Sequence, residues 1–206
     1  RVADPNADCR DALAADFGVA TFAEAPAAVE GTSTWLFAVK PQVMRQVCES
    51  LSAAAQATQP LVVSIAAGIT STQLERWLGD SSAVVRSMPN TPALLGAGVT
   101  GLFANAHVDA HGRQLAQALL SSAGQTVWID DEALAPDAAR TLVLQTVLGA
   151  ARMLTESDVA PEELRRRVTS PNGTTQAAVE TFQAGGHETP GGAAMYEVTG
   201  RRRGFA

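Results

Sequence analysis

The sequence predicts an α/β fold, a parallel sheet with helical crossovers, followed by an all-helical region. Two observations carry this prediction. Up to about residue 134, short apolar runs alternate with segments of helical spacing, which is typical of parallel strands joined by crossover helices. After that point only helical patterns follow. We therefore expect two domains, residues 1–134 and 135–206.

Each strand candidate is a short apolar run, as expected for a strand buried on both faces. The candidates are residues 34–39, 60–68, 83–88, 98–105 and 125–130. The helix candidates carry start and stop signals, because proline fits the first helical turn and glycine favours the position just after the last. They are residues 6–17, ending at Gly18, residues 41–55, beginning with Pro41, residues 71–79 and residues 109–124.

The C-terminal region begins with a long helix candidate, residues 136–158, which is apolar on nearly every side. Such a helix lies inside a bundle or an oligomer interface. Two more helix candidates follow, one from Pro161 and one over residues 174–186. One chain of this size offers too little helical mass to cover the long helix. We therefore expect a homodimer or a higher homo-oligomer.

The composition excludes several classes of function. The 206 residues are 46% hydrophobic and carry a formal net charge of −6, which is typical of a globular protein that does not bind nucleic acid. No apolar run approaches the roughly 20 residues of a membrane span. No secretory signal opens the chain, so we expect no membrane association and a cytoplasmic location.

The cysteines and histidines show no metal-binding pattern, and we expect no metal. Cys9 and Cys48 form no CxxC pair, and as isolated thiols they fit a reducing compartment and a place in the core. His107 and His111 are four residues apart, but the residues between them lack the glutamate of a zinc protease. We expect both histidines on the surface, beside a helix start.

Three predicted strands end in unusual sequences, at residues 38–42, 66–68 and 88–92. Parallel strands share one edge for their carboxyl ends, where doubly wound sheets bind ligands, so these sequences indicate a ligand crevice. The alternative is that Pro-Asn-Thr-Pro in the third is only a tight turn. Lys40 lies in the first of these sequences, residues 38–42. Its side chain is either simply exposed or directed at a phosphate.

A fourth candidate, Thr-Ser-Pro-Asn-Gly-Thr-Thr at residues 169–175, precedes a predicted helix. Thr174 or Thr175 can cap that helix, and the backbone N–H groups beyond offer an anion site. Capping alone is the alternative.

Taken together and in this order, these segments resemble the pyrroline-5-carboxylate reductase family. The similar segments are AVKPQ, SIAAG, VRSMPNTPALLGAGVTGL, QTVLGAARML and VTSPNGTTQAAVETF. The resemblance covers most of residues 2–186. It implies a Rossmann-like domain that binds NADPH or NADH and a helical domain that pairs with a second subunit. It also implies reduction of 1-pyrroline-5-carboxylate to L-proline, the last step of proline biosynthesis.

The resemblance implies roles for individual residues. The cofactor-binding residues would be Ala38, Val39, Lys40, Pro41, Ile65, Ala66, Ala67, Asn90 and Asp4. The substrate-binding residues would be Ser170, Gly173, Thr174, Thr175 and Asn90. Thr175 would act in catalysis, with its hydroxyl reaching the ring nitrogen. Asp4 lies where a Rossmann domain contacts the ribose, and its carboxylate disfavours a 2′-phosphate. We expect Arg10, roughly one helical turn further along, to return to the same end of the strand and offset this effect. The family's usual cofactor favours NADPH slightly.

The sequence departs from the family in three places. The family's first strand and its glycine-rich turn are missing before Arg1, which predicts a strand-wide slot beside Val2. A glycine- and serine-rich segment and a helix are missing between Leu134 and Ala135, where we expect a gap. The tail after Gly186 carries Pro190, where the family has a smooth final helix, so we expect part of that helix to be broken here. Two alternatives stay open: a related imine or β-hydroxyacid reductase, and a truncated, non-catalytic oligomeric homologue.

Overall fold

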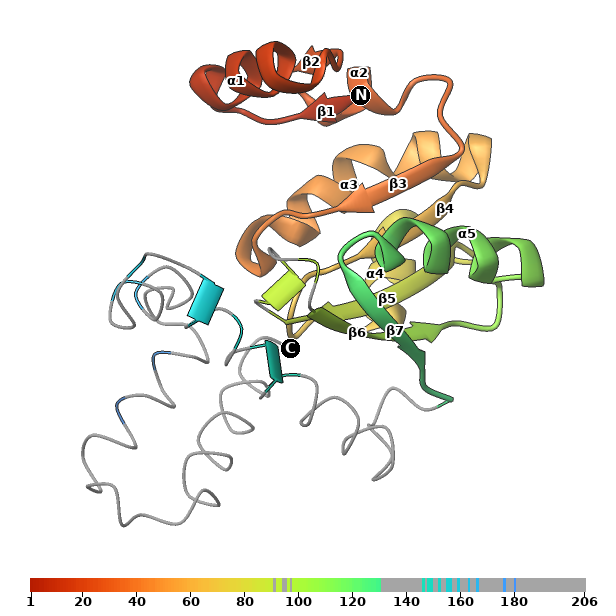
Figure 1. Cartoon of the computed structure of the whole chain (residues 1–206). Coiled ribbons are helices and arrows are strands. Elements are labelled where there is room, and N and C mark those ends of the chain that lie inside the picture. Colours follow the sequence, from red (N-terminus) through yellow and green to blue (C-terminus); the bar gives the residue numbers. More distant parts are fainter. Residues whose placement is uncertain are drawn as a thin grey trace.

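A computed structural model describes residues 1–90, 92–93, 96 and 98–130, and the single residues 146, 148, 149, 152, 155, 156, 159, 163, 166, 176 and 180. Helices and strands alternate along the chain, except where the strand Gly98–Ala104 directly follows the strand Ala83–Pro89 (Figure 1). They are β1 (Val2–Ala3), α1 (Ala7–Phe17), β2 (Thr21–Phe22), α2 (Ala25–Val29), β3 (Thr34–Phe37), α3 (Pro41–Thr58), β4 (Leu61–Ser64), α4 (Ser71–Leu78), β5 (Ala83–Pro89), β6 (Gly98–Ala104), α5 (Ala110–Ser121) and β7 (Gly124–Trp128).

The main sheet has five strands in the order β3-β4-β5-β6-β7. β3, β4 and β5 are parallel, and β7 is parallel to β6, which it follows through the crossover helix α5. β6 runs antiparallel to β5. The connection at residues 90–97 is too short for a parallel crossover, which needs a dozen or more residues. The expected parallel sheet is therefore mostly parallel, with one reversal.

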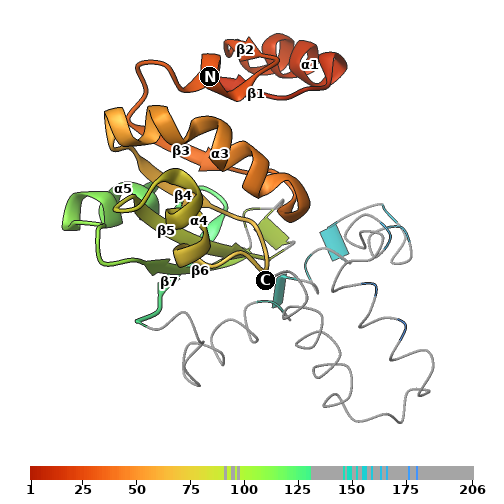
Figure 2. The same cartoon turned by 180° about the vertical axis from the view of Figure 1, so that it is seen from behind.

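Helices cover both faces of the main sheet. The side chains of Val62 and Val84 pack with α3 and α4 in one cluster, and their neighbours Val63 and Val85 pack with α5 in a second. This division follows from the strand period of two residues. Figures 1 and 2, which view the molecule from opposite sides, show α3 and α4 on one face and α5 on the other.

β1 and β2 form a separate two-stranded sheet. In both views this pair lies at the far side of β3 and α3 from β7 (Figures 1 and 2). Within the described part of the chain, β1 pairs only with β2, and β3 pairs only with β4, so each has one unpaired edge. α1 has no buried residue, and Phe17 is 71% exposed. Among the described residues, the unpaired edge of β1 agrees with the predicted strand-wide slot beside Val2.

Local signals set the helix ends. α1 ends at Gly18, whose φ of 63° is in the left-handed region that glycine adopts readily, and Pro41 occupies the first turn of α3. The side chain of Thr70 accepts a hydrogen bond from the backbone N–H of Gln73, and the Gln73 side chain accepts one from Thr70 in return. Among the described residues, no helix combines the length and apolar character that a bilayer span requires.

The predicted helices at 136–158, from Pro161 and over 174–186 lie outside the described residues, apart from single positions. The ion pairs Arg152–Glu156 and Glu163–Arg166 have the i,i+4 and i,i+3 spacing of a helix. The predicted gap at Leu134–Ala135 and the tail after Gly186 also lie outside the described residues, as does the domain boundary.

Candidate functional site

The carboxyl ends of β3 and β4 lie side by side at one edge of the main sheet. Phe37 pairs with Ser64 in the parallel register, and the N–H of Ile65 donates to the carbonyl oxygen of Phe37 at 3.1 Å. The hydroxyl of Ser87 in β5 donates to the carbonyl oxygen of Ser64 at 3.0 Å, and both serines are buried. These bonds bring the first two predicted strand ends together, at Ala38 and Ile65.

The third strand end lies farther out. Arg86 of β5 is the register partner of Ser64, yet β5 continues to Pro89 because it pairs with β6 over this length. Three more residues at about 3.3 Å each extend β5 roughly 10 Å beyond the ends of its parallel neighbours. Asn90 therefore lies past the edge that Ala38 and Ile65 share.

Asn90 makes hydrogen bonds through its backbone and through both ends of its side chain. Its carbonyl oxygen accepts from the N–H of Ala93 at 3.1 Å, and its Oδ1 accepts from the N–H of Val99 at 2.9 Å. Its Nδ2 donates to Oγ1 of Thr146 at 2.8 Å. The polar corner that the sequence indicated is thus bonded to β6 and to a residue of the C-terminal region. Thr146 lies in the similar segment QTVLGAARML, but no sequence signal assigned this residue a role.

Lys40 and Pro41 connect the end of β3 to α3. Lys40 is exposed, and its side chain makes no capping hydrogen bond at the start of this helix. Since the amino end of a helix carries partial positive charge, an anion at this place would meet both the helix dipole and the Lys40 ammonium.

The remaining cofactor candidates at this edge are small or apolar. Ala38 is exposed, and Val39, Ile65 and Ala67 are half-buried. Ala66 is only 5% exposed and packs in the core cluster against α3 and α4, so it offers backbone rather than side chain to a ligand.

Asp4 follows β1, in the separate two-stranded sheet. Its Oδ1 accepts a hydrogen bond from the N–H of Asn6 at 2.8 Å. Nη1 of Arg10 donates to the Asp4 carbonyl oxygen at 2.7 Å, so Arg10 reaches back to this end of β1 as the sequence predicted.

The substrate-binding candidates Ser170, Gly173, Thr174 and Thr175 lie outside the described residues. The two thiols differ from one another. Cys48 is buried, as predicted, and burial raises its pKa from 9.0 to about 12. Cys9 is exposed on α1, so the expected core position is wrong for this residue, because α1 buries none of its side chains.

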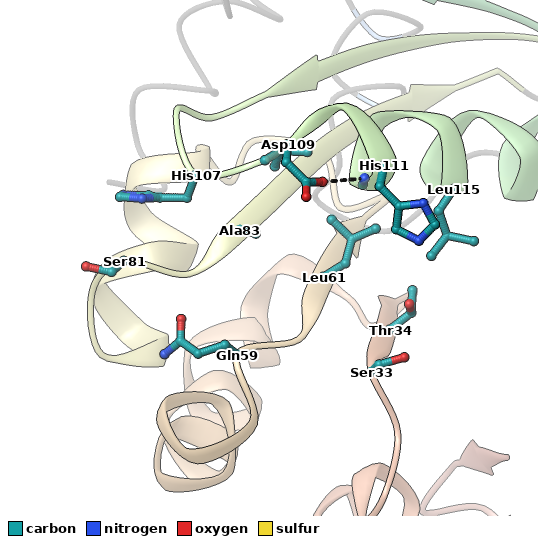
Figure 3. Close-up of a pocket in the computed structure, with 12 residues that line it drawn as sticks. Ser33, Thr34, Gln59, Leu61, Ser81, Ala83, His107, Asp109, His111 and Leu115 are labelled. Atoms are coloured by element: carbon teal, nitrogen blue, oxygen red, sulfur yellow. Dashed lines mark hydrogen bonds between the residues drawn. The ribbon is translucent and has the colours of Figure 1, made fainter.

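A cavity of about 430 Å³ lies at the opposite edge, beside the amino ends of β3, β4 and β5 (Figure 3). Thr34, Leu61 and Ala83, the first residues of these strands, line it together with His107 and His111. Both histidines are near the start of α5, as predicted, and Nε2 of His107 lies 2.9 Å from Oε1 of Glu75. This cavity is therefore separate from the strand ends described above. Among the described residues, no His, Cys, Asp and Glu side chains are grouped to hold a metal ion.

Comparisons with known proteins match both halves of the chain. A family model described as pyrroline-5-carboxylate reductase dimerisation matches residues 128–204. A second, described as NADP oxidoreductase, coenzyme F420-dependent, matches residues 1–68.

Among solved structures, a pyrroline-5-carboxylate reductase from Coxiella burnetii is similar with a TM-score of 0.67 and 31% identity, covering 100% of this chain and 87% of that one. The pyrroline carboxylate reductase of Plasmodium falciparum, solved with NADP bound, has a TM-score of 0.56 and 20% identity, covering 92% of this chain and 82% of that one. At this lower identity the similarity shows the fold alone.

The pyrroline-5-carboxylate reductase of Pseudomonas aeruginosa is 43% identical over 219 aligned residues, which cover 91% of this chain and 80% of the relative. Because 91% of 206 residues is about 187, about 30 aligned positions of the relative have no counterpart here. That difference agrees with an internal segment missing from this chain, and its place at 134–135 stays a prediction. At this identity and coverage, the chain belongs to the pyrroline-5-carboxylate reductase family.

Proposed function

We propose that the protein containing this chain reduces 1-pyrroline-5-carboxylate to L-proline with NADPH, the last step of proline biosynthesis. The observation that carries the proposal is the 43% identity to a pyrroline-5-carboxylate reductase over 91% of the chain. Nothing in the described residues favours a related imine or β-hydroxyacid reductase, or a non-catalytic scaffold.

The edge of the main sheet where β3 and β4 have their carboxyl ends is suited to a dinucleotide. Ala38 is small and exposed, so a ribose or a flat ring can approach the backbone there. Lys40 and the start of α3 offer positive charge for a phosphate, and Arg10 offers it near the ribose. We assign cofactor contacts to Asp4, Ala38, Val39, Lys40, Pro41, Ile65, Ala66, Ala67 and Asn90. When bound, the nicotinamide supplies a hydride.

The substrate contacts are assigned to Ser170, Gly173, Thr174 and Thr175, with Asn90 near the nicotinamide. Backbone N–H groups at the helix start would hold the substrate carboxylate, and the Thr175 hydroxyl would form a hydrogen bond with the ring nitrogen. A protonated imine accepts a hydride at the carbon of its C=N bond and becomes the secondary amine of proline. The protein's main contributions are therefore position and polarisation.

We further propose a homodimer in the cytoplasm. A dimerisation family model matches residues 128–204, and in that region Leu148 is an apolar side chain 55% exposed in the single chain. The free thiols of Cys9 and Cys48 are compatible with a reducing compartment.

A cofactor-oxidation assay of the full-length protein tests the reaction. We expect the nicotinamide absorbance to fall when both NADPH and the cyclic imine are present, and to hold steady when either is omitted. Parallel assays with other cyclic imines and with β-ketoacids measure specificity. No absorbance loss with 1-pyrroline-5-carboxylate, in protein shown to be folded and dimeric, would end the proposal.

A further inference from the structure

We infer that Thr146 is a positioning residue for the reaction and acts through the side-chain amide of Asn90. The hydroxyl of Thr146 receives the Nδ2 hydrogen bond of Asn90 at 2.8 Å, across 56 positions of sequence. The inference rests on the proposed function, in which Asn90 lies near the nicotinamide.

The second hydrogen bond of the amide decides its orientation. The backbone N–H of Val99 is a donor, so the atom of Asn90 that faces it must be the oxygen, and the distance is 2.9 Å. Nδ2 then faces Thr146, whose hydroxyl oxygen acts as the acceptor. With Val99 alone, the amide could still swing about its oxygen. With both partners, the two ends of the amide are held.

The two partners belong to different parts of the chain. Val99 lies in β6, which pairs with β5 in the main sheet. This pairing holds Asn90 relative to the carboxyl ends of β3 and β4, where the cofactor is proposed to bind. Thr146 lies in the region that the dimerisation family model matches, residues 128–204. That region also contains the proposed substrate residues at 170–175. The Asn90–Thr146 bond thus joins the element proposed to hold the hydride donor to the region proposed to hold the acceptor.

Hydride transfer is sensitive to such a connection. The reacting atoms must approach to about 3–3.5 Å, and a displacement of about 1 Å can cost a hundredfold in rate. A contact that keeps Asn90 in register with the C-terminal region therefore affects the hydride step itself, although Thr146 is not placed in contact with substrate or cofactor.

The test compares three variants of the full-length protein. Thr146→Val keeps the shape of the side chain but removes the acceptor, and Thr146→Ser retains it. Thr155→Val is the matched control, because that hydroxyl donates to the carbonyl oxygen of Arg152 at 3.2 Å in the same region of the chain. We expect Thr146→Val to lower kcat/KM about 2- to 10-fold, as for the loss of one neutral hydrogen bond. Thr146→Ser should restore the wild-type value, and Thr155→Val should leave it unchanged.

A deuterium isotope effect separates positioning from a purely structural role. With NADPH deuterated at the transferred position of the ring, Thr146→Val should show a larger isotope effect on kcat than wild type, because the hydride step becomes slower relative to the others. Loss of folded or dimeric protein lowers kcat without changing the isotope effect. An unchanged isotope effect, or wild-type kinetics for Thr146→Val, would overturn the inference.

The double variant tests the route through Asn90. If Thr146 acts by holding this amide, Asn90→Ala with Thr146→Val should be no slower than Asn90→Ala alone. Fully additive losses would overturn the inference and leave the proposed function intact. A folded wild-type protein without reductase activity would instead refute the proposed function, so the two failures are distinguishable.

Discussion

Nη1 of Arg10 donates a hydrogen bond to the backbone carbonyl oxygen of Asp4 at 2.7 Å, so the end of β1 carries a cation as well as the Asp4 side chain. The bond to the neutral carbonyl leaves the guanidinium with its full charge. In the proposed cofactor site, Arg10 would attract a 2′-phosphate and Asp4 would repel it.

Cofactor preference should follow these two charges. Arg10→Gln should lower kcat/KM for NADPH about tenfold, the effect of one lost hydrogen bond to a charged group, and change the value for NADH little. Asp4→Asn should raise the ratio of kcat/KM for NADPH to kcat/KM for NADH. Arg76→Gln, a change of an exposed arginine on α4, serves as the control. If Arg10→Gln lowered kcat/KM equally for NADPH and NADH, this would contradict a role of Arg10 in recognising the 2′-phosphate.

Thr175→Ala should slow turnover without unfolding the protein. If the hydroxyl forms a hydrogen bond with the charged ring nitrogen, its removal costs about 1.5–3 kcal/mol of transition-state stabilisation. This corresponds to roughly a ten- to hundredfold fall in kcat/KM. Thr175→Ser should keep most of the activity. Steady-state kinetics measure the effect, and circular dichroism verifies the fold. Unchanged kinetics in Thr175→Ala would leave this residue only the role of a helix cap.

The two thiols should differ in reactivity. At pH 8, a thiol reagent such as DTNB should react quickly with exposed Cys9, and Cys9→Ser should abolish this fast reaction. Cys48 should react only as the protein unfolds, because burial raises its pKa to about 12. Rapid labelling of two thiols in the native protein would contradict the buried position of Cys48.

The raised pKa of Cys48 also predicts a loss of stability at alkaline pH. Below pH 9 the thiol is neutral in both states, so it adds no pH dependence. Between pH 9 and about 12 it ionises in the unfolded chain but not in the native protein, so the free energy of unfolding falls as pH rises. Denaturant titrations of wild type and Cys48→Ala over this range measure the difference. The decline should be shallower in Cys48→Ala.

Asn105 should be important for stability, because its side chain forms hydrogen bonds with the backbone at the start of β5. Its Oδ1 accepts from the N–H of Val84 at 3.0 Å, and its Nδ2 donates to the carbonyl oxygen of Ser82 at 2.9 Å. Asn105→Ala leaves the N–H of fully buried Val84 without this partner and should cost about 2–3 kcal/mol. Thr72→Ala, an exposed change on α4, should stay within about 0.5 kcal/mol of wild type. Similar midpoints for both variants in urea would contradict this assignment.

Leu148 should contribute to the dimer. It is 55% exposed in the single chain and lies in the region that the dimerisation family model matches. Burying a leucine in an interface stabilises it by about 1.5–3 kcal/mol, so Leu148→Asp should weaken dimerisation. Leu119→Asp changes a leucine of α5 that is 41% exposed and should leave the mass unchanged. Light scattering coupled to size exclusion measures both, and a full dimer of Leu148→Asp at micromolar concentration would count against the assignment.

The sequence by itself determined the local elements. Gly18 ends α1, Pro41 begins α3, and two apolar runs became β3 and β5 close to their expected bounds, whereas β4 covers only Leu61–Ser64 of the run predicted at 60–68. These signals act within a few residues, through backbone dihedral angles, caps and the alternation of apolar side chains. The motif segments also indicated the family, which the comparisons then established.

Tertiary structure alone decided how these elements meet. β5 extends past its parallel neighbours because it pairs with β6, and this places Asn90 beyond the edge rather than on it. Thr146 lies in the segment QTVLGAARML, but no pattern there predicts its bond to Asn90, because a hydrogen bond across 56 residues depends on where the whole fold brings two side chains.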